Sequence, residues 1–202
     1  FLKEEGNFAV PMYAADVAVA RAIQKVKVTG GPVMIADTQD NPGCGAAGDT
    51  TGLIHLLCEA DVADVTIGAL FDPISAQAAQ TAGVGQIIEL SLGGASDPMG
   101  DPPVTGLFEV AAIHAGAVRL DGPLGGGRML DLSPLVLLRH RGHNIIVAGK
   151  RGQTHDSAIL RAVGIDPQNQ NIIVVKSSFH YRADFDQFAS ANIVALSPGG
   201  FQ

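Results

Sequence analysis

Residues 32–51, PVMIADTQDNPGCGAAGDTT, join an apolar run, a glycine-rich loop and the start of a helical pattern. The opening run has the continuous apolar character of a parallel strand that is buried on both faces. Leucines then recur at helical spacing over about 50–60, and Asp49 or Thr50 can cap this helix. A strand, a loop and a helix in this order are typical of α/β proteins, which place ligands where such strands end.

The same alternation continues on both sides of this stretch. Upstream, the pattern predicts a helix over about 14–27 that ends at Gly30-Gly31. Downstream, strands are expected over 64–71, 85–92, 171–177 and 192–196. Helices are expected over 73–82 and 155–163, and a helix or turn over 180–190. The alternation up to residue 92 favours a parallel sheet with helices packed on it.

Residues 104–148 have a different pattern, because short apolar runs there alternate with turn signals. Arg141-Gly142-His143 lies between two such runs and reads as a hairpin tip. We therefore expect an α/β fold with a mostly parallel sheet, flanking helices and an antiparallel β-hairpin insertion over about 104–148.

Composition and charge exclude several classes of protein. The 202-residue chain has a formal net charge of -7 and no Lys/Arg-rich run, which argues against nucleic-acid binding. Its longest apolar runs, 64–71 and 171–177, have the length of strands and not of membrane spans. Two cysteines and no signal-peptide pattern suggest a cytoplasmic protein, and a first residue other than Met suggests a fragment of a longer chain.

The glycine loop raises the question of nucleotide binding. The pattern G-x-G-x-x-G is formed by Gly43, Gly45 and Gly48. However, the loop also contains three aspartates that would repel a pyrophosphate, and Asp49 stands where a phosphate-binding loop has its lysine. The alternatives are a site for a small anion or nucleotide, and a tight turn at 40–43 followed by a helix cap.

Two clusters of polar residues follow predicted strands and are candidate functional-site residues. The first contains Asp40, Asn41, Gly43, Gly45, Asp49, Thr50 and Thr51, and the second contains Lys176, Ser177, Ser178, His180 and Arg182. If the two strands are parallel neighbours, both clusters open on one sheet edge. We assign catalytic roles to His180 and Lys176 and substrate binding to the others, with His180 moving a proton or donating to an oxyanion. The alternative is that Lys176 and Arg182 pair with the aspartates of the loop.

The histidines do not form a metal-binding pattern in this chain. They are scattered, and no H-E-x-x-H arrangement is present. His140 and His143 lie three positions apart across the expected hairpin tip, so we interpret them as solvent-exposed turn residues.

Four stretches resemble the carboxy-terminal domain of the MlrC-type proteins, the M81 metallopeptidase family related to microcystinase. They are 35-IADTQDNPGCGAAGDTT-51, 71-FDPISAQAAQTAGVG-85, 90-LSLGGASDP-98 and 164-GIDPQNQNIIVVKSSFHYRADF-185. Their order and spacing agree with the family from about residue 8 to residue 199.

The resemblance implies a zinc-dependent hydrolase of small peptides or related amides. It places the zinc in an amino-terminal half that this chain lacks, so that the fragment alone would be inactive. Residues 1–30 would then be a junction segment and helix, and residues 31–202 the carboxy-terminal α/β domain that positions the substrate. A stand-alone anion-binding module and a structural half that mediates homo-oligomer formation are the alternatives.

Overall fold

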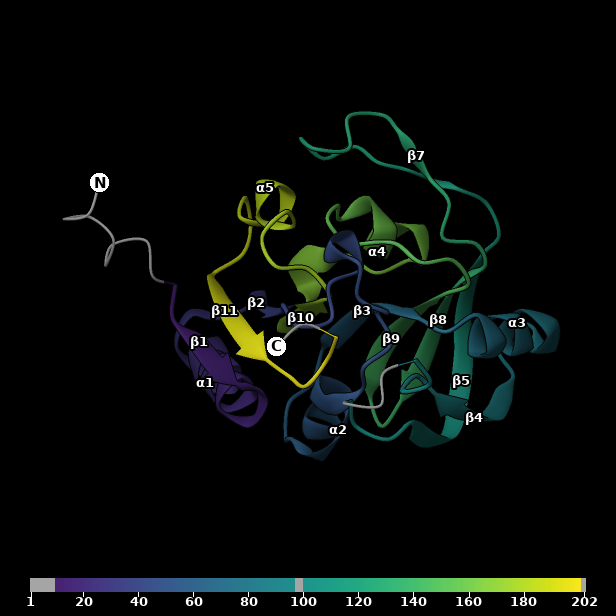
Figure 1. Ribbon diagram of the computed structural model, residues 1–202, viewed down its shortest axis with the longest axis horizontal. Coiled ribbons are helices and arrows are strands. Elements are labelled where there is room, and N and C mark those ends of the chain that lie inside the picture. Colours follow the sequence, from purple (N-terminus) through teal and green to yellow (C-terminus); the bar gives the residue numbers. More distant parts are fainter. Residues whose placement is uncertain (1–9, 97–99, 201–202) are drawn as a thin grey trace.

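The computed structural model describes residues 10–96 and 100–200, which build a nine-stranded sheet (Figure 1). The strands, in spatial order, are β1 (Met12–Ala14), β11 (Ala191–Leu196), β2 (Val33–Asp37), β10 (Ile172–Val175), β3 (Val65–Phe71), β9 (His143–Ala148), β8 (Leu135–His140), β5 (Val104–His114) and β4 (Ile87–Leu92). Neighbours are parallel from β1 to β9 and antiparallel from β9 to β4. The expected α/β fold with a mostly parallel sheet is confirmed.

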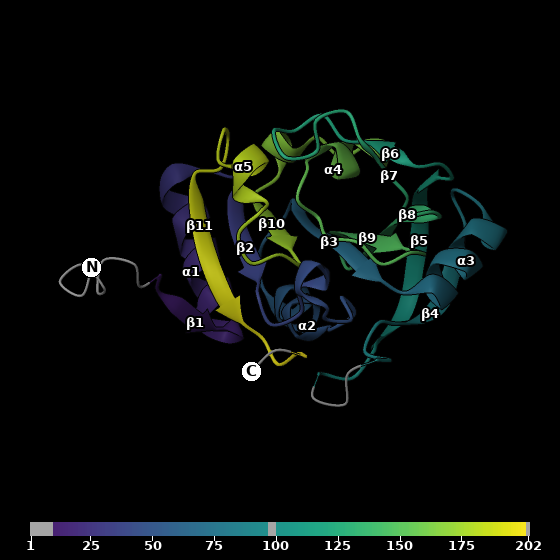
Figure 2. The same ribbon diagram turned by 45° about the horizontal axis from the view of Figure 1, so that its top comes forward.

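Helices cover both faces of this sheet (Figure 2). One face packs against α1 (Ala15–Thr29), α2 (Gly52–Glu59) and α3 (Pro73–Ala82), which bury side chains such as Ala22, Leu57 and Ala76. The opposite face packs against α4 (Ala158–Ala162), α5 (Arg182–Phe185) and a ribbon formed by β6 (Val118–Arg119) and β7 (Met129–Leu130). The central strands read as unbroken apolar runs because they are buried on both faces.

Strand β4 corrects one expectation from the sequence. We expected residues 85–92 to be a third parallel strand, but β4 is the edge strand and pairs antiparallel with β5. Its side chains alternate between exposed and partly buried positions. Such alternation is typical of an antiparallel strand with one covered face, and Glu89 and Ser91 already signalled it in the sequence.

The antiparallel part is confirmed and is continuous with the parallel sheet, because β9 also pairs parallel with β3. The β8–β9 hairpin turns at Arg141 (φ 48°) and Gly142 (φ 82°), as a two-residue turn requires. However, His140 and His143 are buried, so their interpretation as solvent-exposed turn residues is wrong. The His143 ring Nε2 lies 2.9 Å from the Leu57 carbonyl oxygen.

Residues 12–29, which we expected to be a junction, pack against the same sheet. Strand β1 pairs with β11, and α1 buries Ala18 and Ala22 in the shared core. Residues 1–9 of that segment and 97–98 of the stretch LSLGGASDP lie outside the described residues. Within the described residues, no helix is long and apolar enough to cross a membrane.

Candidate functional site

The candidate site lies at the carboxyl ends of β2 and β10, which are parallel neighbours. The glycine loop, residues 38–51, leads from β2 to α2, whereas residues 176–181 lead from β10 to α5. The two connections diverge, because α2 and α5 pack on opposite faces of the sheet. Crevices between diverging connections are the usual ligand sites of open α/β sheets. The pairing therefore confirms that the two polar clusters share one sheet edge.

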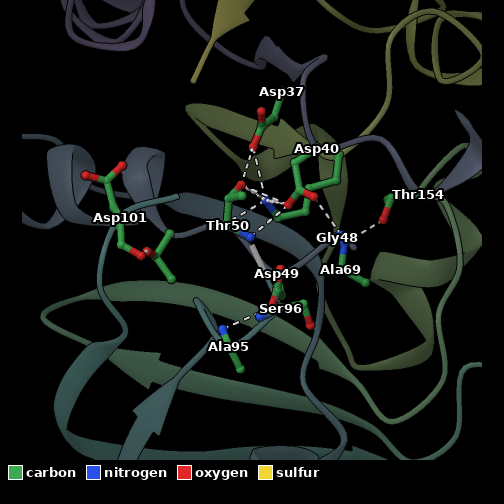
Figure 3. A network of polar contacts seen from close by, with 12 residues as sticks. Asp37, Asp40, Gly48, Asp49, Thr50, Ala69, Ala95, Ser96, Asp101 and Thr154 are labelled. Atoms are coloured by element: carbon green, nitrogen blue, oxygen red, sulfur yellow. Dashed lines mark hydrogen bonds and ion pairs between the residues drawn. The ribbon is translucent and has the colours of Figure 1, made fainter. Parts of the chain in front are cut away.

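Asp40 organises the glycine loop from inside. Its carboxylate is fully buried and accepts hydrogen bonds from the backbone amides of Gly48 (2.7 Å) and Thr50 (2.8 Å) and from the Thr50 hydroxyl (2.8 Å) (Figure 3). Gly48 has φ +82°, and a Cβ there would lie 2.7 Å from Pro42 Cγ. Gly48 therefore serves a tight turn around a carboxylate.

Lys176 joins this loop to β2. Its Nζ donates hydrogen bonds to Asp37 Oδ2 (3.0 Å) and Asp40 Oδ2 (2.7 Å), and lies 2.9 Å from both the carbonyl and the hydroxyl oxygen of Thr50. The Lys176 side chain is 3% exposed. The alternative in which Lys176 pairs with the aspartates of the loop therefore describes its position. The catalytic role that we assigned to Lys176 would require contact with a substrate, and this side chain is almost fully buried.

Burial and mutual charge shift the pKa of all three ionisable groups. Burial raises the pKa of Asp37, and the Asp40 charge adds to this rise against the attraction of Lys176. Burial acts on Asp40 too, but the charge and hydrogen bonds of Lys176 and the amides of Thr50 and Gly48 hold its pKa below the ordinary value. Burial opposes the charge on Lys176, but the two carboxylates hold its pKa above the ordinary value. The charged forms of Lys176 and Asp40 therefore stabilise each other, and burial disfavours the charge of Asp37.

Asp49 holds a second loop. Its Oδ2 accepts hydrogen bonds from the amides of Ala95 (3.0 Å) and Ser96 (2.7 Å) (Figure 3). Its backbone carbonyl accepts one from the Gly94 amide (2.7 Å). The expectation that Asp49 or Thr50 caps α2 is therefore wrong. The N-cap residue is Thr51, which makes no side-chain cap hydrogen bond.

The amino end of α2 already faces a carboxylate of this chain. A Cβ on Gly52 would lie 2.3 Å from Asp101 Oδ2 and 2.8 Å from Ser197 Oγ, so both oxygens lie against the first turn. The Thr51 hydroxyl donates to the Pro102 carbonyl (2.8 Å) and fixes this contact. An anion would have to displace Asp101, which weighs against the alternative of a small-anion or nucleotide site.

A chain of polar side chains lies outside this buried network. Asn41 Nδ2 donates to Ser178 Oγ (3.0 Å), and Gln153 Nε2 donates to Ser177 Oγ (2.8 Å). Gln153 Oε1 lies 3.2 Å from His180 Nδ1. We call Asn41, Gln153, Ser177, Ser178 and His180 the polar chain. His180 is exposed, and its Nε2 has no partner among the described residues.

Gln153 is the member of the polar chain that the sequence did not indicate. It follows β9 and lies near both clusters, since a Cβ on Gly43 would be 2.7 Å from its Oε1. No motif surrounds it, so only the position of β9 beside β3 could have identified it. The exposed Gly43 and Gly45 (φ +103°) form the adjacent surface of the loop.

Arg182 is not part of this arrangement. Its Nε donates to Asp186 Oδ2 (2.9 Å), one turn along α5, and its guanidinium lies 5.2 Å from the centre of the Phe179 ring. The alternative in which Arg182 pairs with the aspartates of the loop is therefore wrong.

The described residues also provide no set of metal ligands. Over residues 10–96 and 100–200, no group of three or more His, Cys, Asp or Glu side chains is placed to hold a metal ion. The described residues therefore offer no site for the zinc, which the family resemblance places in the amino-terminal half.

The comparison with known structures shows the fold. A solved structure from Mesorhizobium sp. BNC1, described as a proposed metallopeptidase, superimposes with a TM-score of 0.84 at 21% sequence identity. The match covers 98% of this chain and 39% of that one.

Sequence comparison shows the family. The family described as MlrC C-terminus matches residues 35–202. "Microcystinase C" from Sphingomonas sp is 30% identical over 193 residues, which are 96% of this chain and 36% of that protein. Both relatives carry the names of hydrolases. The chain spans little more than a third of their length. The chain therefore belongs to the MlrC family and corresponds to its carboxy-terminal domain.

Proposed function

We propose that this chain is the substrate-positioning part of a zinc-dependent hydrolase of peptides or related amides. The observation that carries the proposal is the polar chain at the carboxyl ends of the parallel strands. His180 is exposed there, and its Nε2 has no partner in the described part of the chain. The names of the relatives, a microcystinase and a proposed metallopeptidase, support the reaction class. The metal would be held outside this chain.

Within this proposal, the members of the polar chain have different roles. His180 contacts the substrate, where its ring donates a hydrogen bond or transfers a proton at Nε2. Gln153 is a positioning residue, because its amide fixes the His180 ring from one side and the Ser177 hydroxyl from the other. Asn41 is buried and orients the Ser178 hydroxyl toward the site.

The first test compares the 202-residue chain with a longer protein that carries the upstream region. We expect the longer protein to bind zinc and hydrolyse peptides, and the short chain to do neither. Stoichiometric zinc and activity in the short chain would overturn the division of roles.

The second test uses matched variants of the longer protein. We expect His180→Ala and Gln153→Ala to lower kcat/KM without changing zinc content or melting temperature. Gln77→Ala is the control, because Gln77 is an exposed glutamine on the outer side of α3, where it bonds Gln80. Equal activity in all three variants would show that the polar chain takes no part in the reaction.

The dimerisation alternative has one observation in its favour. Ile87 lies on the edge strand β4 and Leu107 on its partner β5, and they are 66% and 65% exposed. Light scattering of the wild type and of Leu107→Lys tests this alternative, because a charge on that surface would dissociate a dimer formed through it.

A further inference from the structure

A pocket of about 410 Å³ lies beside the polar chain, between α5 and the loop of the β6–β7 ribbon. His180 lines this pocket together with Leu124, Phe179, Arg182, Ala183 and Asp186. Because His180 also belongs to the polar chain, a ligand that contacts its ring has direct access to the pocket.

The walls of the pocket are apolar and open to a ligand. Phe179 is 62% exposed and Leu124 is 45% exposed, although each is a large apolar side chain. Single exposed apolar residues are common, but here two of them from distant segments converge on one hollow. Ala183 adds a methyl group to the lining.

Buried carboxylates hold the two walls in place. Asp156 Oδ2 accepts a hydrogen bond from the Gly122 amide in the ribbon (2.8 Å), and Asp184 Oδ2 in α5 accepts one from the Ser157 amide (2.7 Å). Because Asp156 and Ser157 are adjacent, the ribbon and α5 are tied to the same point. Figure 2 shows the ribbon extending over α4 toward α5. The pocket is therefore formed before a ligand arrives, which lowers the entropic cost of binding.

The loop tip that carries Leu124 is braced separately. Arg128 donates from its guanidinium to the Leu124 carbonyl (2.9 Å) and from Nε to the Gly125 carbonyl (3.2 Å). These charge-assisted bonds fix the backbone of Leu124.

The charges of the pocket neutralise each other. Arg182 in α5 forms an ion pair with Asp186 just after the helix, and the Arg182 guanidinium also lies over the Phe179 ring. The two charges offset each other and the other walls are mostly apolar, so the pocket favours a neutral, apolar group.

We propose that this pocket is the subsite for a bulky apolar side chain, aromatic or branched aliphatic, of the peptide or amide substrate. The peptide backbone then contacts His180 and the polar chain, and the side chain beside the cleaved bond enters between Leu124 and Phe179. This assignment rests on the proposed function, since the substrate is the one that His180 positions.

The test measures side-chain preference in the longer protein. Tetrapeptides that differ at one position, with Phe, Leu, Ala or Asp there, are compared by kcat/KM, and each position is varied in turn. At one position we expect Phe and Leu to exceed Ala on the order of 10- to 100-fold, with Asp the poorest. Phe179→Ala and Leu124→Ala should reduce that preference several-fold and leave the Ala peptide nearly unchanged.

Ile74→Ala is the matched control, because Ile74 is 81% exposed on α3 and lies outside this pocket. An unchanged preference in both pocket variants would overturn the assignment. It would also be overturned if they lowered zinc content or melting temperature without changing preference, since the surface would then receive the amino-terminal half.

The same peptides separate this inference from the proposed function. If no peptide is hydrolysed, the proposed function fails, and binding of fluorescent Phe and Ala peptides to the longer protein is measured instead. Selective binding of the Phe peptide that Phe179→Ala abolishes would still support the pocket. Equal binding of both peptides would overturn it.

Discussion

Lys176 and His180 leave the same strand, four positions apart, but lie in opposite environments. The Lys176 side chain is 3% exposed and meets two carboxylates, whereas His180 is exposed and one of its ring nitrogens has no partner within residues 10–96 and 100–200. The buried group therefore shapes the loop, and the exposed group is the one that can reach a ligand. Charge or titratable chemistry at a strand end does not by itself mark a catalytic residue.

The same contrast predicts that the two groups contribute differently to the stability of the fold. The Lys176 pairs are desolvated, so removal of one partner leaves a buried charge unpaired. In the polar chain, His180 is exposed and Gln153 is partly exposed, so water largely replaces the hydrogen bond between them when it is lost. Substitutions at the two sites should therefore affect folding very differently.

The largest effect is expected from Lys176→Met. This change leaves Asp37 and Asp40 buried without their cation and should lower the free energy of unfolding by about 3–5 kcal/mol. Urea denaturation measures it. The control is Lys150→Met, which removes an exposed pair with Asp131 and should leave the free energy of unfolding nearly unchanged. Equal costs would show that Lys176 is not desolvated.

Asp40→Asn and Asp37→Asn sharpen the comparison inside the buried network. Asp40→Asn removes an ionised acceptor of several hydrogen bonds and should cost about 1.5–3 kcal/mol at pH 7. Asp37→Asn should cost less, because burial disfavours its charge and raises its pKa.

The two variants should also differ in their dependence on pH. The stabilisation from Asp40 is present above its unfolded pKa of about 3.9 and is lost as the pH falls through its lower folded pKa. The contribution of Asp37 has the opposite sign, since it is present below about 3.9 and lost as the pH rises through its raised folded pKa. Unfolding curves at several pH values measure both, and parallel pH profiles would contradict these opposite shifts.

His143 provides a smaller, pH-dependent effect. Burial lowers the pKa of its ring, so the unfolded chain takes up a proton at higher pH than the folded protein. Its contribution is complete above the unfolded pKa of about 6.5 and is lost as the pH falls toward the folded pKa. In His143→Gln, the melting temperature should depend less on pH over that range than it does in the wild type. If the melting temperature of the variant changes with pH as steeply as that of the wild type, another group causes the effect.

The smallest effect on stability is expected from His180→Ala. Because the side chain is exposed, the free energy of unfolding should change by no more than about 0.5 kcal/mol. Urea denaturation checks this beside the activity measurement. A loss as large as that of Lys176→Met would place His180 in the structural network instead of at the ligand.

The sequence by itself determined the main elements of the parallel sheet and their class. Runs such as 33–37 and 172–175 are apolar throughout, apart from the terminal Asp37, and a strand of this kind needs cover on both faces. Local glycine and proline signals also placed the loop at the carboxyl end of β2. The family motifs indicated the MlrC carboxy-terminal domain, which the comparisons confirm.

Only the tertiary structure decided which polar residues are buried and which meet at the surface. Asp37, Asp40 and Lys176 come from segments about 140 residues apart, and their burial follows from the pairing of β2 with β10. Gln153 joins the polar chain because β9 lies beside β3, and Leu124 reaches α5 because Asp156 holds the ribbon. The sequence determines the chemical type of each side chain, but the burial of that side chain and its contacts depend on which distant segments the fold brings together.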